Sequence, residues 1–391
     1  MIVKPKVREY ICTTAHPLGC RENVRLQKEL VKAKGNLQGP KKVLIIGAST
    51  GYGLSSRIMS AFGCKASTLG IMFERPANEK RTATAGWYNT WAFEEFAKEE
   101  GLYARTINGD AFSKEIKEET IRIIKEDLKE VDLVIYSLAA PRRIMPDGRV
   151  AVSSLRTTDT AFTEKNLDLR TNEVNQKTVE AATQEELCGT IDVMGGGDWK
   201  DWIDALKDAN VLAENAVTVA YSYIGPKLTY PIYYNGTIGA AKKDLHRAQE
   251  EICKKYQDVQ AYVSVNKALV TQASSAIPIV PLYFSILYKV MKNKGTHEGC
   301  IEQICRLFHE KLYVENPILD ENGLIRMDDW ELKEDVQSEV EKIWEQIQTE
   351  NVKELADIDG YWEDFYHMFG FGYDIIDYEK DVEIEKFISG I

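Results

Sequence analysis

The fold class of this 391-residue chain is decided by one stretch, Val43-Leu44-Ile45-Ile46-Gly47-Ala48-Ser49-Thr50-Gly51-Tyr52-Gly53. Its apolar start is typical of a strand that is buried on both faces. The three glycines let the chain turn tightly, and a helical pattern follows from Leu54. In a Rossmann-type unit, such a turn brings backbone N–H groups and a helix N-terminus to a dinucleotide pyrophosphate. The alternative is a glycine-rich turn in some other α/β protein.

Strands and helices alternate along the chain after this stretch. Helical patterns at residues 90–100 and 114–130 lie between buried-type strands, and this alternation indicates a doubly wound parallel sheet. We therefore predict a Rossmann-type α/β fold in one large domain over residues 1–391, with its core at about 41–290. Besides 43–46, the predicted strands are residues 68–73, 103–107, 132–138, 217–223 and 261–265.

Two parts of the chain depart from the alternation. Residues 145–200 are polar and strand-poor, which predicts an insertion between the fourth strand and the next helix. Residues 291–391 are mostly helical in pattern and predict a C-terminal extension. The apolar segment 277–287, with its two prolines, fits either the wall or lid of an apolar pocket or a core helix. The predicted helices of this last part of the chain are residues 282–292, 298–313 and 329–348.

Composition narrows the class of protein. A net charge of −12 argues against a nucleic-acid-binding surface. Seven scattered cysteines, an odd number without a C-x-x-C pair, are typical of reduced thiols in the cytoplasm. We see no signal peptide, and the longest apolar run, residues 276–291, is too short to span a bilayer. The five histidines show no metal-ligand spacing, so we expect no metal and no membrane partner.

Four strand ends together predict a nicotinamide dinucleotide site. Glu74 follows the second strand, where a carboxylate accepts hydrogen bonds from the adenosine ribose and repels a 2′-phosphate, which favours NADH over NADPH. Arg75 beside it can pair with such a phosphate, so the preference stays open. The third and fourth strands end where adenine and the nicotinamide ribose are expected. The cofactor-binding candidates in these four places are Gly47, Ala48, Ser49, Thr50, Gly51, Tyr52, Phe73, Glu74, Asp110, Ala111, Leu138 and Ala139.

A tyrosine and a lysine after the fifth strand are the catalytic candidates. Reductases of this build often use a Tyr as proton donor and a Lys that binds the nicotinamide ribose and lowers the pKa of the Tyr. Residues nine apart lie on opposite faces of a helix, so the Tyr must lie outside the helix that carries the Lys. A helix with Thr237 as its N-cap meets this condition. Tyr233 with Lys242 and Tyr234 with Lys243 share the spacing, which does not separate them.

Distinctive blocks spread over nearly the whole chain resemble the trans-2-enoyl-CoA reductases and the FabV-class enoyl-acyl-carrier-protein reductases. The resemblance selects Tyr233 and Lys242 as the catalytic pair, although relatives often have a basic residue in place of Tyr234. It also implies that Tyr223 contacts substrate. The blocks are 47–53, Phe73-Glu74-Arg75-Pro76, Ala85-Gly86-Trp87-Tyr88-Asn89, Gly109-Asp110-Ala111-Phe112, 136–143, Val193-Met194-Gly195-Gly196, Ala220-Tyr221-Ser222-Tyr223-Ile224-Gly225 and 265–277, and in the last block the implied cofactor contacts are Leu269, Val270 and Thr271.

The reaction that the resemblance implies is the NADH-dependent reduction of a trans-2-enoyl thioester. Hydride reaches C3, Tyr233 and Tyr223 hydrogen-bond the thioester oxygen, Tyr233 donates the proton, and Lys242 holds the ribose and tunes the phenol. Reduction of crotonyl-CoA to butyryl-CoA in fatty acid metabolism is the expected example.

The sequence constrains the carrier of the thioester substrate and the oligomeric state of the protein less tightly. Coenzyme A is the first choice of carrier, and acyl carrier protein is the alternative. A carbonyl or alcohol dehydrogenase is disfavoured by the long Tyr-Lys spacing. An NADH-binding redox sensor without turnover is a more distant alternative, because it would be expected to lack the Tyr or the Lys. We expect a monomer.

Overall fold

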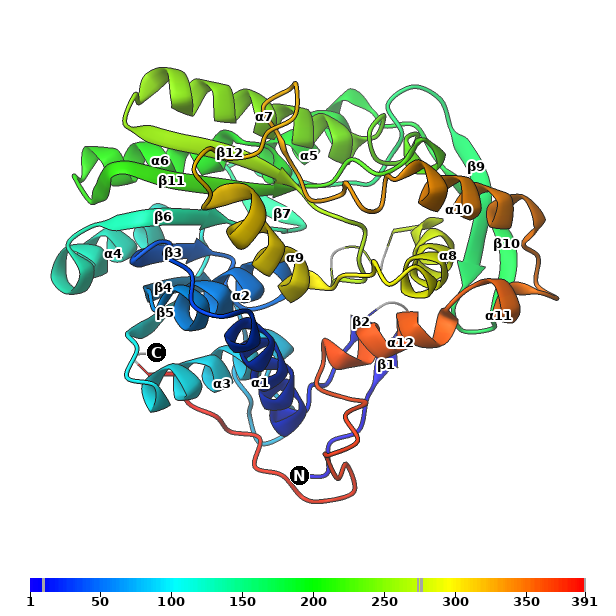
Figure 1. Ribbon diagram of the computed structural model, residues 1–391, viewed down its shortest axis with the longest axis horizontal. Helices are drawn as coiled ribbons and strands as arrows, with labels where there is room; N and C mark the ends of the chain where they lie inside the picture. Colours follow the sequence, from blue (N-terminus) through cyan, green and yellow to red (C-terminus); the bar gives the residue numbers. More distant parts are fainter. Residues whose placement is uncertain (9–10, 273, 275–276, 390–391) are drawn as a thin grey trace.

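The computed structural model describes residues 1–8, 11–272, 274 and 277–389. A seven-stranded parallel sheet forms its centre, in the order β13-β12-β11-β6-β3-β4-β5 (Figure 1). The predicted doubly wound fold is confirmed, and so are the six predicted strands. The strands are β3 (Lys42–Ile46), β4 (Ser67–Met72), β5 (Ala104–Asn108), β6 (Val131–Tyr136), β11 (Leu212–Ser222), β12 (Val259–Val265) and the unpredicted β13 (Ile325–Arg326).

Strand β3 shows why its sequence is apolar throughout. Val43 and Ile45 belong to the hydrophobic cluster on one face of the sheet, and Leu44 and Ile46 to the cluster on the other. Both faces are covered by helices, so residues 43–46 of this strand are all buried. The first cluster includes α1 (Pro17–Lys34), α2 (Gly51–Ile58) and α3 (Ala85–Glu99), and the second includes α4 (Lys114–Ile123), α6 (Gly197–Asp208) and α7 (Thr237–Lys255).

The sheet reverses its winding between β3 and β6. The chain runs from β3 outward through β4 to β5, and then returns to the other side of β3 with β6. Ligands of doubly wound proteins bind at such a switch point, outside the carboxyl ends of the strands. The glycine turn after β3 therefore lies where a dinucleotide is expected.

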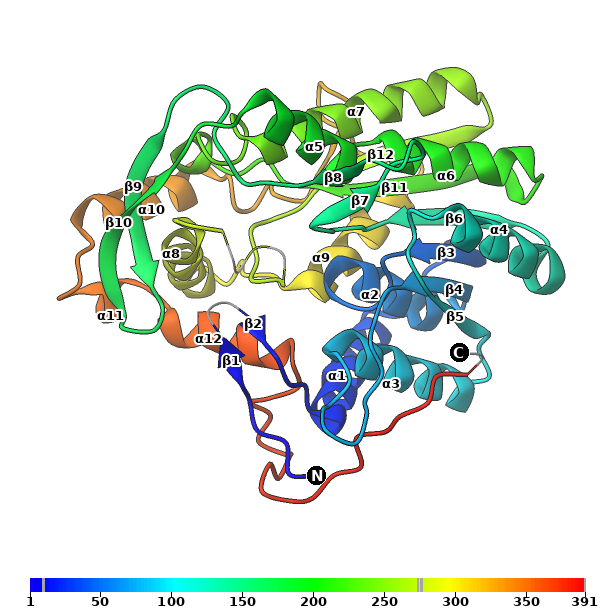
Figure 2. The ribbon, with the colours of Figure 1, turned by 180° about the vertical axis from the view of Figure 1, so that it is seen from behind.

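The prediction that residues 145–200 are poor in strands is wrong. This part contains β8 (Val150–Val152), which pairs with β7 (Arg142–Ile144), and an antiparallel ribbon of β9 (Phe162–Asp168) and β10 (Glu173–Val179), followed by α5 (Gln184–Met194). The ribbon projects beside α8 and α10, away from the central sheet (Figure 2). Most side chains of β10 are exposed, so a polar sequence is compatible with a strand there.

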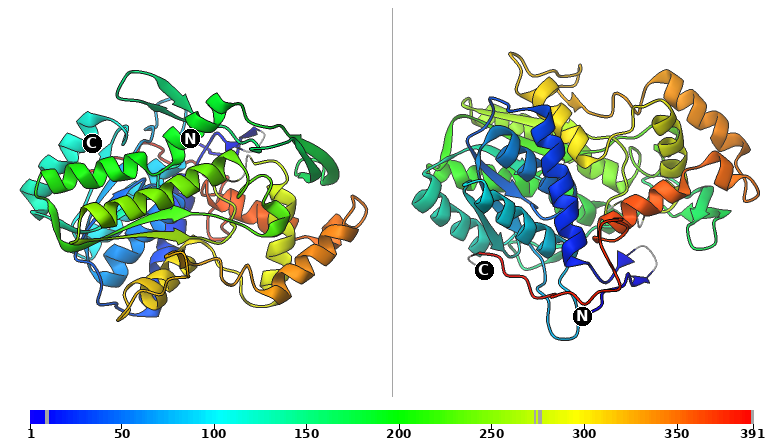
Figure 3. Two further views of the ribbon diagram at one scale, coloured as in Figure 1. Left: turned by 90° about the horizontal axis from the view of Figure 1, so that it is seen from above. Right: turned by 60° about the horizontal axis from the view of Figure 1, so that its bottom comes forward.

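The C-terminal part is helical, as predicted. The segment 277–287 falls mainly in α8, whose residues 280–288 are all buried, which confirms the core-helix interpretation; the pocket wall stays a prediction. Residues 384–386 lie along α3 (Figure 3), where the indole of Trp87 donates to the carbonyl of Lys386 at 2.7 Å and the Tyr88 hydroxyl donates to the carbonyl of Ile384. These helices are α8 (Val280–Asn293), α9 (Cys300–Arg306) with the π-helical Leu307–Leu312, α10 (Glu334–Gln346), α11 (Val352–Leu355) and α12 (Ile358–His367).

The cysteines and the hydropathy of the helices are two further features of the structure. All seven cysteines are free thiols. Among the described residues, no helix has the length and hydropathy needed to cross a membrane.

Candidate active site

The turn between β3 and α2 is shaped for a ligand rather than for side chains. Gly47 has a φ of +87°, and a Cβ added to it would lie 2.2 Å from the carbonyl oxygen of Ser137. A Cβ on Gly53 would lie 1.8 Å from the carbonyl oxygen of Gly47. Helix α2 begins at Gly51, and the side chain of its N-cap, Thr50, makes no capping hydrogen bond. The first N–H groups of α2 therefore have no side-chain cap, which is the arrangement that binds a pyrophosphate.

Glu74 stands beside this turn, two residues after the end of β4. Its Oε1 accepts a hydrogen bond from the Ser49 hydroxyl at 2.6 Å. Its backbone is held by the side chain of Asn108, which pairs with both its N–H and its carbonyl. A Cβ on Gly86 would lie 2.0 Å from the same Oε1, so a glycine is needed there. Burial raises the pKa of this carboxyl. The structure thus fixes a carboxylate next to the glycine turn, as predicted for the adenosine ribose.

The remaining cofactor candidates lie at neighbouring strand ends. Phe73 is 79% exposed after β4. Asp110, after β5, accepts from the backbone N–H of Phe112 at 3.0 Å and so closes a turn, while the carbonyl of the buried Ala111 accepts from the indole of Trp202. After β6, Leu138 is half-buried and Ala139 is exposed. Since β6, β3, β4 and β5 are adjacent and parallel, these residues share one edge of the sheet.

Two tyrosines meet at the other end of the predicted site. Tyr223 follows β11, and Tyr233 lies in the turn before α7. Their ring centroids are 4.7 Å apart, with the ring planes at 80°. Burial raises the pKa of Tyr233, and the negative charge of Glu331 raises it further. The expected lowering of this pKa by Lys242 is not seen, since burial and the charge of Glu331 both raise it.

Helix α7 begins one residue earlier than predicted. Gly236 is its N-cap and Thr237 its first residue, because the Thr237 hydroxyl donates to the carbonyl of Ser154 instead of capping the helix. A Cβ on Gly239 would lie 2.1 Å from the carbonyl oxygen of Tyr233, so this glycine lets the turn pack against the helix. Tyr233 is thereby outside the helix that carries Lys242, as the spacing predicted.

Lys242 links the catalytic candidates to the glycine turn. Its Nζ donates to the carbonyl oxygen of Tyr221 at 2.9 Å, and burial lowers its pKa to about 8. The hydroxyls of Tyr221 and Ser56 are hydrogen-bonded at 2.6 Å, and the rings of Tyr221 and Tyr52 lie 5.5 Å apart. Since Ser56 and Tyr52 both belong to α2, the lysine and the dinucleotide turn meet across Tyr221.

The alternative pair, Tyr234 and Lys243, faces solvent. Tyr234 is 40% exposed and packs on Tyr230, with ring centroids 5.0 Å apart. The Nζ of the exposed Lys243 lies 4.3 Å from the centre of the Tyr234 ring. This cation–π pair occupies the outer side of α7 and not the buried cluster, so the structure favours Tyr233 with Lys242.

The segment that follows β12 lies against the glycine turn. The Tyr52 hydroxyl donates to the carbonyl of Lys267 at 3.1 Å. Leu269 and Val270 are buried, and the backbone N–H of Val270 donates to the Tyr288 hydroxyl. Thr271 is half-buried and forms a turn closed by the Ser274 hydroxyl. Residues 273, 275 and 276 of the same block lie outside the described residues.

Glu331 belongs to this cluster and was missed by the sequence analysis. It is fully buried, and its carboxylate accepts from the hydroxyls of Tyr283 at 2.6 Å and Tyr223 at 3.2 Å and from the N–H of Ala268 at 2.7 Å. It comes from the C-terminal extension, between β13 and α10. No motif surrounds it, and the only available signal was an acidic residue next to Trp330.

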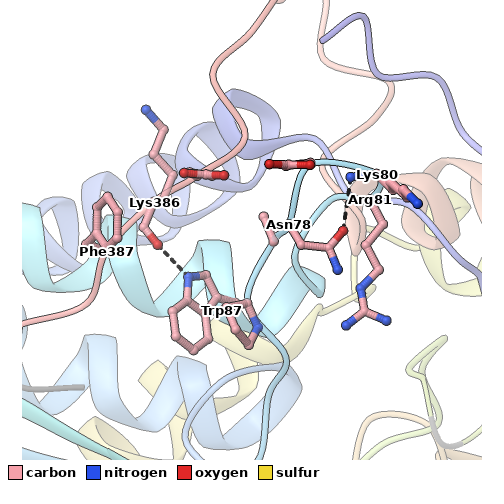
Figure 4. Close-up of a pocket in the computed structure, with 10 residues that line it drawn as sticks. Asn78, Lys80, Arg81, Trp87, Lys386 and Phe387 are labelled. Carbon is pink, nitrogen blue, oxygen red and sulfur yellow. Dashed lines mark hydrogen bonds between the residues drawn. The ribbon is translucent and has the colours of Figure 1, made fainter.

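Two surface pockets lie away from the tyrosine pair. One of about 640 Å³ is formed by residues 76–81, Trp87 and the tail residues 385–387 (Figure 4). The second, of about 340 Å³, is lined by residues 11–15, Glu74 and Gln272, among others. Neither is lined by Tyr233 or Lys242, but the second joins the Glu74 end of the cofactor edge to the segment after Thr271.

Three family models match consecutive parts of the chain. The model described as the NAD(P)H binding domain of trans-2-enoyl-CoA reductase matches residues 2–79. The model of the trans-2-enoyl-CoA reductase catalytic region matches residues 81–313 and includes Tyr223, Tyr233 and Lys242. The third, described as an enoyl reductase FAD binding domain, matches residues 319–382.

The residues of the third match do not fit an FAD. All of residues 319–382 are described, and their only strand is the two-residue β13, followed by Met327 and Asp328 rather than by glycines. The helices α10 and α12 of this part pack on α8. A Rossmann-type site for a flavin dinucleotide has a strand, a glycine turn and a helix N-terminus for the pyrophosphate, and residues 319–382 do not contain this arrangement. No step proposed for this protein passes through a flavin.

Close relatives span the whole chain. The trans-2-enoyl-CoA reductase [NADH] of Ruminiclostridium cellulolyticum is 53% identical over 100% of both chains. The enoyl-[acyl-carrier-protein] reductase [NADH] of Saccharophagus degradans is 57% identical over 98% of both. The crystal structure of the Clostridium acetobutulicum trans-2-enoyl-CoA reductase in complex with NADH, 47% identical over 98% of both chains, superimposes with a TM-score of 0.96. These matches, like the resemblance seen in the sequence, show that the chain belongs to the trans-2-enoyl-CoA reductase family.

Proposed function

We propose that this protein reduces the 2,3-double bond of trans-2-enoyl-CoA with NADH. The observation that carries the proposal is the connection from the glycine turn to Lys242 through Tyr221, with the buried Tyr233 preceding the same helix. Relatives named as NADH-dependent enoyl reductases, and a relative solved in complex with NADH, support it.

The cofactor-binding residues fit NADH. The N–H groups at the start of α2 would bind the pyrophosphate, and Glu74 would accept hydrogen bonds from the adenosine ribose. The fixed carboxylate of Glu74 repels a 2′-phosphate, which favours NADH over NADPH. When bound, NADH supplies the hydride that reduces C3 of the enoyl thioester.

Tyr233 is the proposed proton donor. Its raised pKa keeps the phenol protonated at neutral pH, so a proton is available whenever substrate is bound. As the double bond is reduced, negative charge gathers on the thioester oxygen, and a hydrogen bond from the phenol stabilises it there. The proton then passes to C2, which completes the saturated thioester.

Lys242 is proposed to bind and orient the nicotinamide ribose. Its ammonium group is held at the carbonyl of Tyr221, beside the α2 residues that form the cofactor turn. Below a pH of about 8 the group carries a positive charge, which favours the developing negative charge in the site. Binding of the ribose and stabilisation of the developing negative charge both depend on the ammonium form of Lys242.

Coenzyme A is the proposed carrier, and acyl carrier protein is the alternative. Both carriers are named among close relatives. We propose a monomer that works in the cytoplasm, which agrees with the seven free thiols.

The test is NADH oxidation, followed by its absorbance, with crotonyl-CoA and with crotonyl-acyl carrier protein in parallel. Turnover of crotonyl-CoA with the higher kcat/KM, and butyryl-CoA as product, is the expected result. A higher kcat/KM for crotonyl-acyl carrier protein would show that acyl carrier protein is the preferred carrier, while the proposed reduction would stand. No turnover of either substrate by a protein that still binds NADH would overturn the proposal and favour a redox sensor.

A further inference from the structure

Three segments of the chain meet at the carboxylate of Glu331. Its Oε1 accepts hydrogen bonds from the hydroxyls of Tyr283 on α8 and Tyr223 after β11, and its Oε2 accepts from the N–H of Ala268. The carbonyl of Glu331 is itself held by the amide of Gln337 at 2.6 Å. The carboxylate therefore joins α8, the substrate side of the site and the cofactor segment that leads to Leu269.

Burial raises the pKa of Glu331, while Lys267 and the groups that hydrogen-bond the carboxylate oppose this shift. Lys267 is buried beside it, and its positive charge acts on the carboxylate. The hydroxyls of Tyr223 and Tyr283 and the backbone N–H of Ala268 all donate to this carboxylate. An ionised carboxylate only accepts, whereas a phenol has a single O–H to donate. The one proton of Tyr223 is thus directed at Glu331.

The single O–H of Tyr223, directed at Glu331, separates the roles of the two tyrosines. The resemblance to enoyl reductases implied that Tyr223 and Tyr233 both donate to the thioester oxygen. A phenol that donates to Glu331 has no second proton for the substrate. The ring of Tyr223 still packs against Tyr233 nearly at right angles, so its position determines where the Tyr233 phenol lies.

We infer that Glu331 is a positioning residue for the enoyl reduction. It holds the Tyr223 hydroxyl, so that the Tyr223 ring supports Tyr233 and Tyr233 alone donates to the thioester oxygen. The inference rests on the proposed function and adds to it a residue of the C-terminal extension that acts through Tyr223.

The first test compares the two phenols by substitution. Tyr223→Phe keeps the ring but removes the hydroxyl, and we expect kcat with crotonyl-CoA to fall no more than about tenfold. Tyr233→Phe should lower kcat by at least about a hundredfold, the usual contribution of a proton donor. Equal losses would show that both phenols donate to the substrate, which overturns the inference.

The second test measures the coupling between Glu331 and Tyr223. We expect Glu331→Gln to lower kcat by about as much as Tyr223→Phe does, and no more than about tenfold, with the Kd for NADH changed less than about threefold. In the Tyr223→Phe background the same substitution should have little further effect on kcat. In the Tyr283→Phe background, where the other phenol on the same oxygen is lost, its effect on kcat should persist.

A purely structural role gives a different result. Glu331→Gln would then lower kcat equally in both backgrounds, and this result would overturn the inference. If Glu331→Gln does not fold, the comparison of Tyr223→Phe with Tyr233→Phe still decides. Wild-type protein that turns over crotonyl-CoA separates a failure of this inference from a failure of the proposed function.

Discussion

The rings of Tyr223 and Tyr233 meet nearly at right angles, with centroids 4.7 Å apart. Edge-to-face packing of this kind contributes about 0.5–1.5 kcal/mol beyond the burial of the rings. One ring follows β11 and the other precedes α7, so the contact joins the sheet to the turn that carries Tyr233, the proposed proton donor. Lys242, in α7, donates a hydrogen bond to the carbonyl of Tyr221, whose side chain contacts α2.

Tyr233 and its neighbour Tyr234 form a matched pair for mutagenesis. Tyr233→Phe removes the proposed proton donor without opening a cavity, and kcat with crotonyl-CoA should fall by at least about a hundredfold. Tyr234→Phe changes a half-exposed ring that packs on Tyr230, and its kcat should stay within about twofold of wild type. Steady-state NADH oxidation by the two variants measures the difference. A large loss in Tyr234→Phe with an active Tyr233→Phe would exchange the two assignments.

The pKa of Lys242 predicts the pH dependence of the reaction. Below a pH of about 8 the side chain is an ammonium group, and above it a neutral amine that cannot supply the charge. The kcat/KM for NADH should therefore fall as the pH rises through about 8, because kcat/KM reports groups of the free enzyme. In Lys242→Arg, which stays charged, this decrease should disappear. If the decrease persists in Lys242→Arg, it would be assigned to Lys267, because burial also lowers the pKa of that lysine to about 8.

The lowered pKa of Lys242 also predicts how the free energy of unfolding changes with pH. Lys242 ionises at about 8 in the folded protein and at its ordinary value of 10.5 in the unfolded chain. Between these values the unfolded chain binds more protons, so this group makes the free energy of unfolding rise with pH. Chemical denaturation of wild type and Lys242→Met at pH values from 7 to 10 measures its share. A wild-type curve no steeper than that of Lys242→Met would contradict the low pKa.

Glu74 should set the preference for NADH. Its carboxylate is fixed by Ser49 beside the glycine turn, so it repels the 2′-phosphate of NADPH. Glu74→Ala should raise the ratio of kcat/KM for NADPH to that for NADH on the order of tenfold or more. Glu79→Ala, which removes an exposed carboxylate of the following loop, is the matched control and should leave the ratio unchanged. An unaltered ratio in Glu74→Ala would show that Arg75 or another group selects the cofactor.

Two glycines of the turn separate folding from ligand binding. In Gly47→Ala the new Cβ would lie 2.2 Å from the backbone of Ser137, so thermal stability and NADH binding should both be lost. In Gly51→Ala the Cβ meets nothing within 4 Å, and a φ of +52° costs about 1–2 kcal/mol. Gly51→Ala should therefore stay folded but bind NADH more weakly, because its methyl group occupies space that the pyrophosphate approaches. Calorimetric unfolding and NADH titration distinguish the two effects, and unchanged NADH affinity in Gly51→Ala would place the pyrophosphate elsewhere.

The parts of the fold that the sequence predicted are those with local signals. The all-apolar β3 and the glycines after it sit in a parallel sheet because burial on both faces requires that composition. The turn that separates Tyr233 from the helix of Lys242 followed from helix geometry alone. The exact N-cap did not, because the Thr237 hydroxyl bonds to Ser154, which is distant in sequence.

What the sequence could not predict depends on contacts between distant segments. Glu331 lies 108 residues from Tyr223 along the chain, in a region whose pattern indicates only helices. The ribbon of β9 and β10 escaped prediction because both strands are polar in sequence and most side chains of β10 are exposed, whereas strand patterns are read from apolar residues. The resemblance identified Tyr233 over Tyr234, and the structure adds the reason that Tyr234 points outward with Lys243.

The most direct test of the proposed reaction is isotopic. Crotonyl-CoA is reduced with NADH that carries deuterium at the transferable position, in ordinary water, and the product is examined by mass spectrometry. The account predicts butyryl-CoA with one deuterium at C3 and an unlabelled proton at C2. Recovery of unreduced crotonyl-CoA, or of a product labelled at a carbon other than C3, would contradict it.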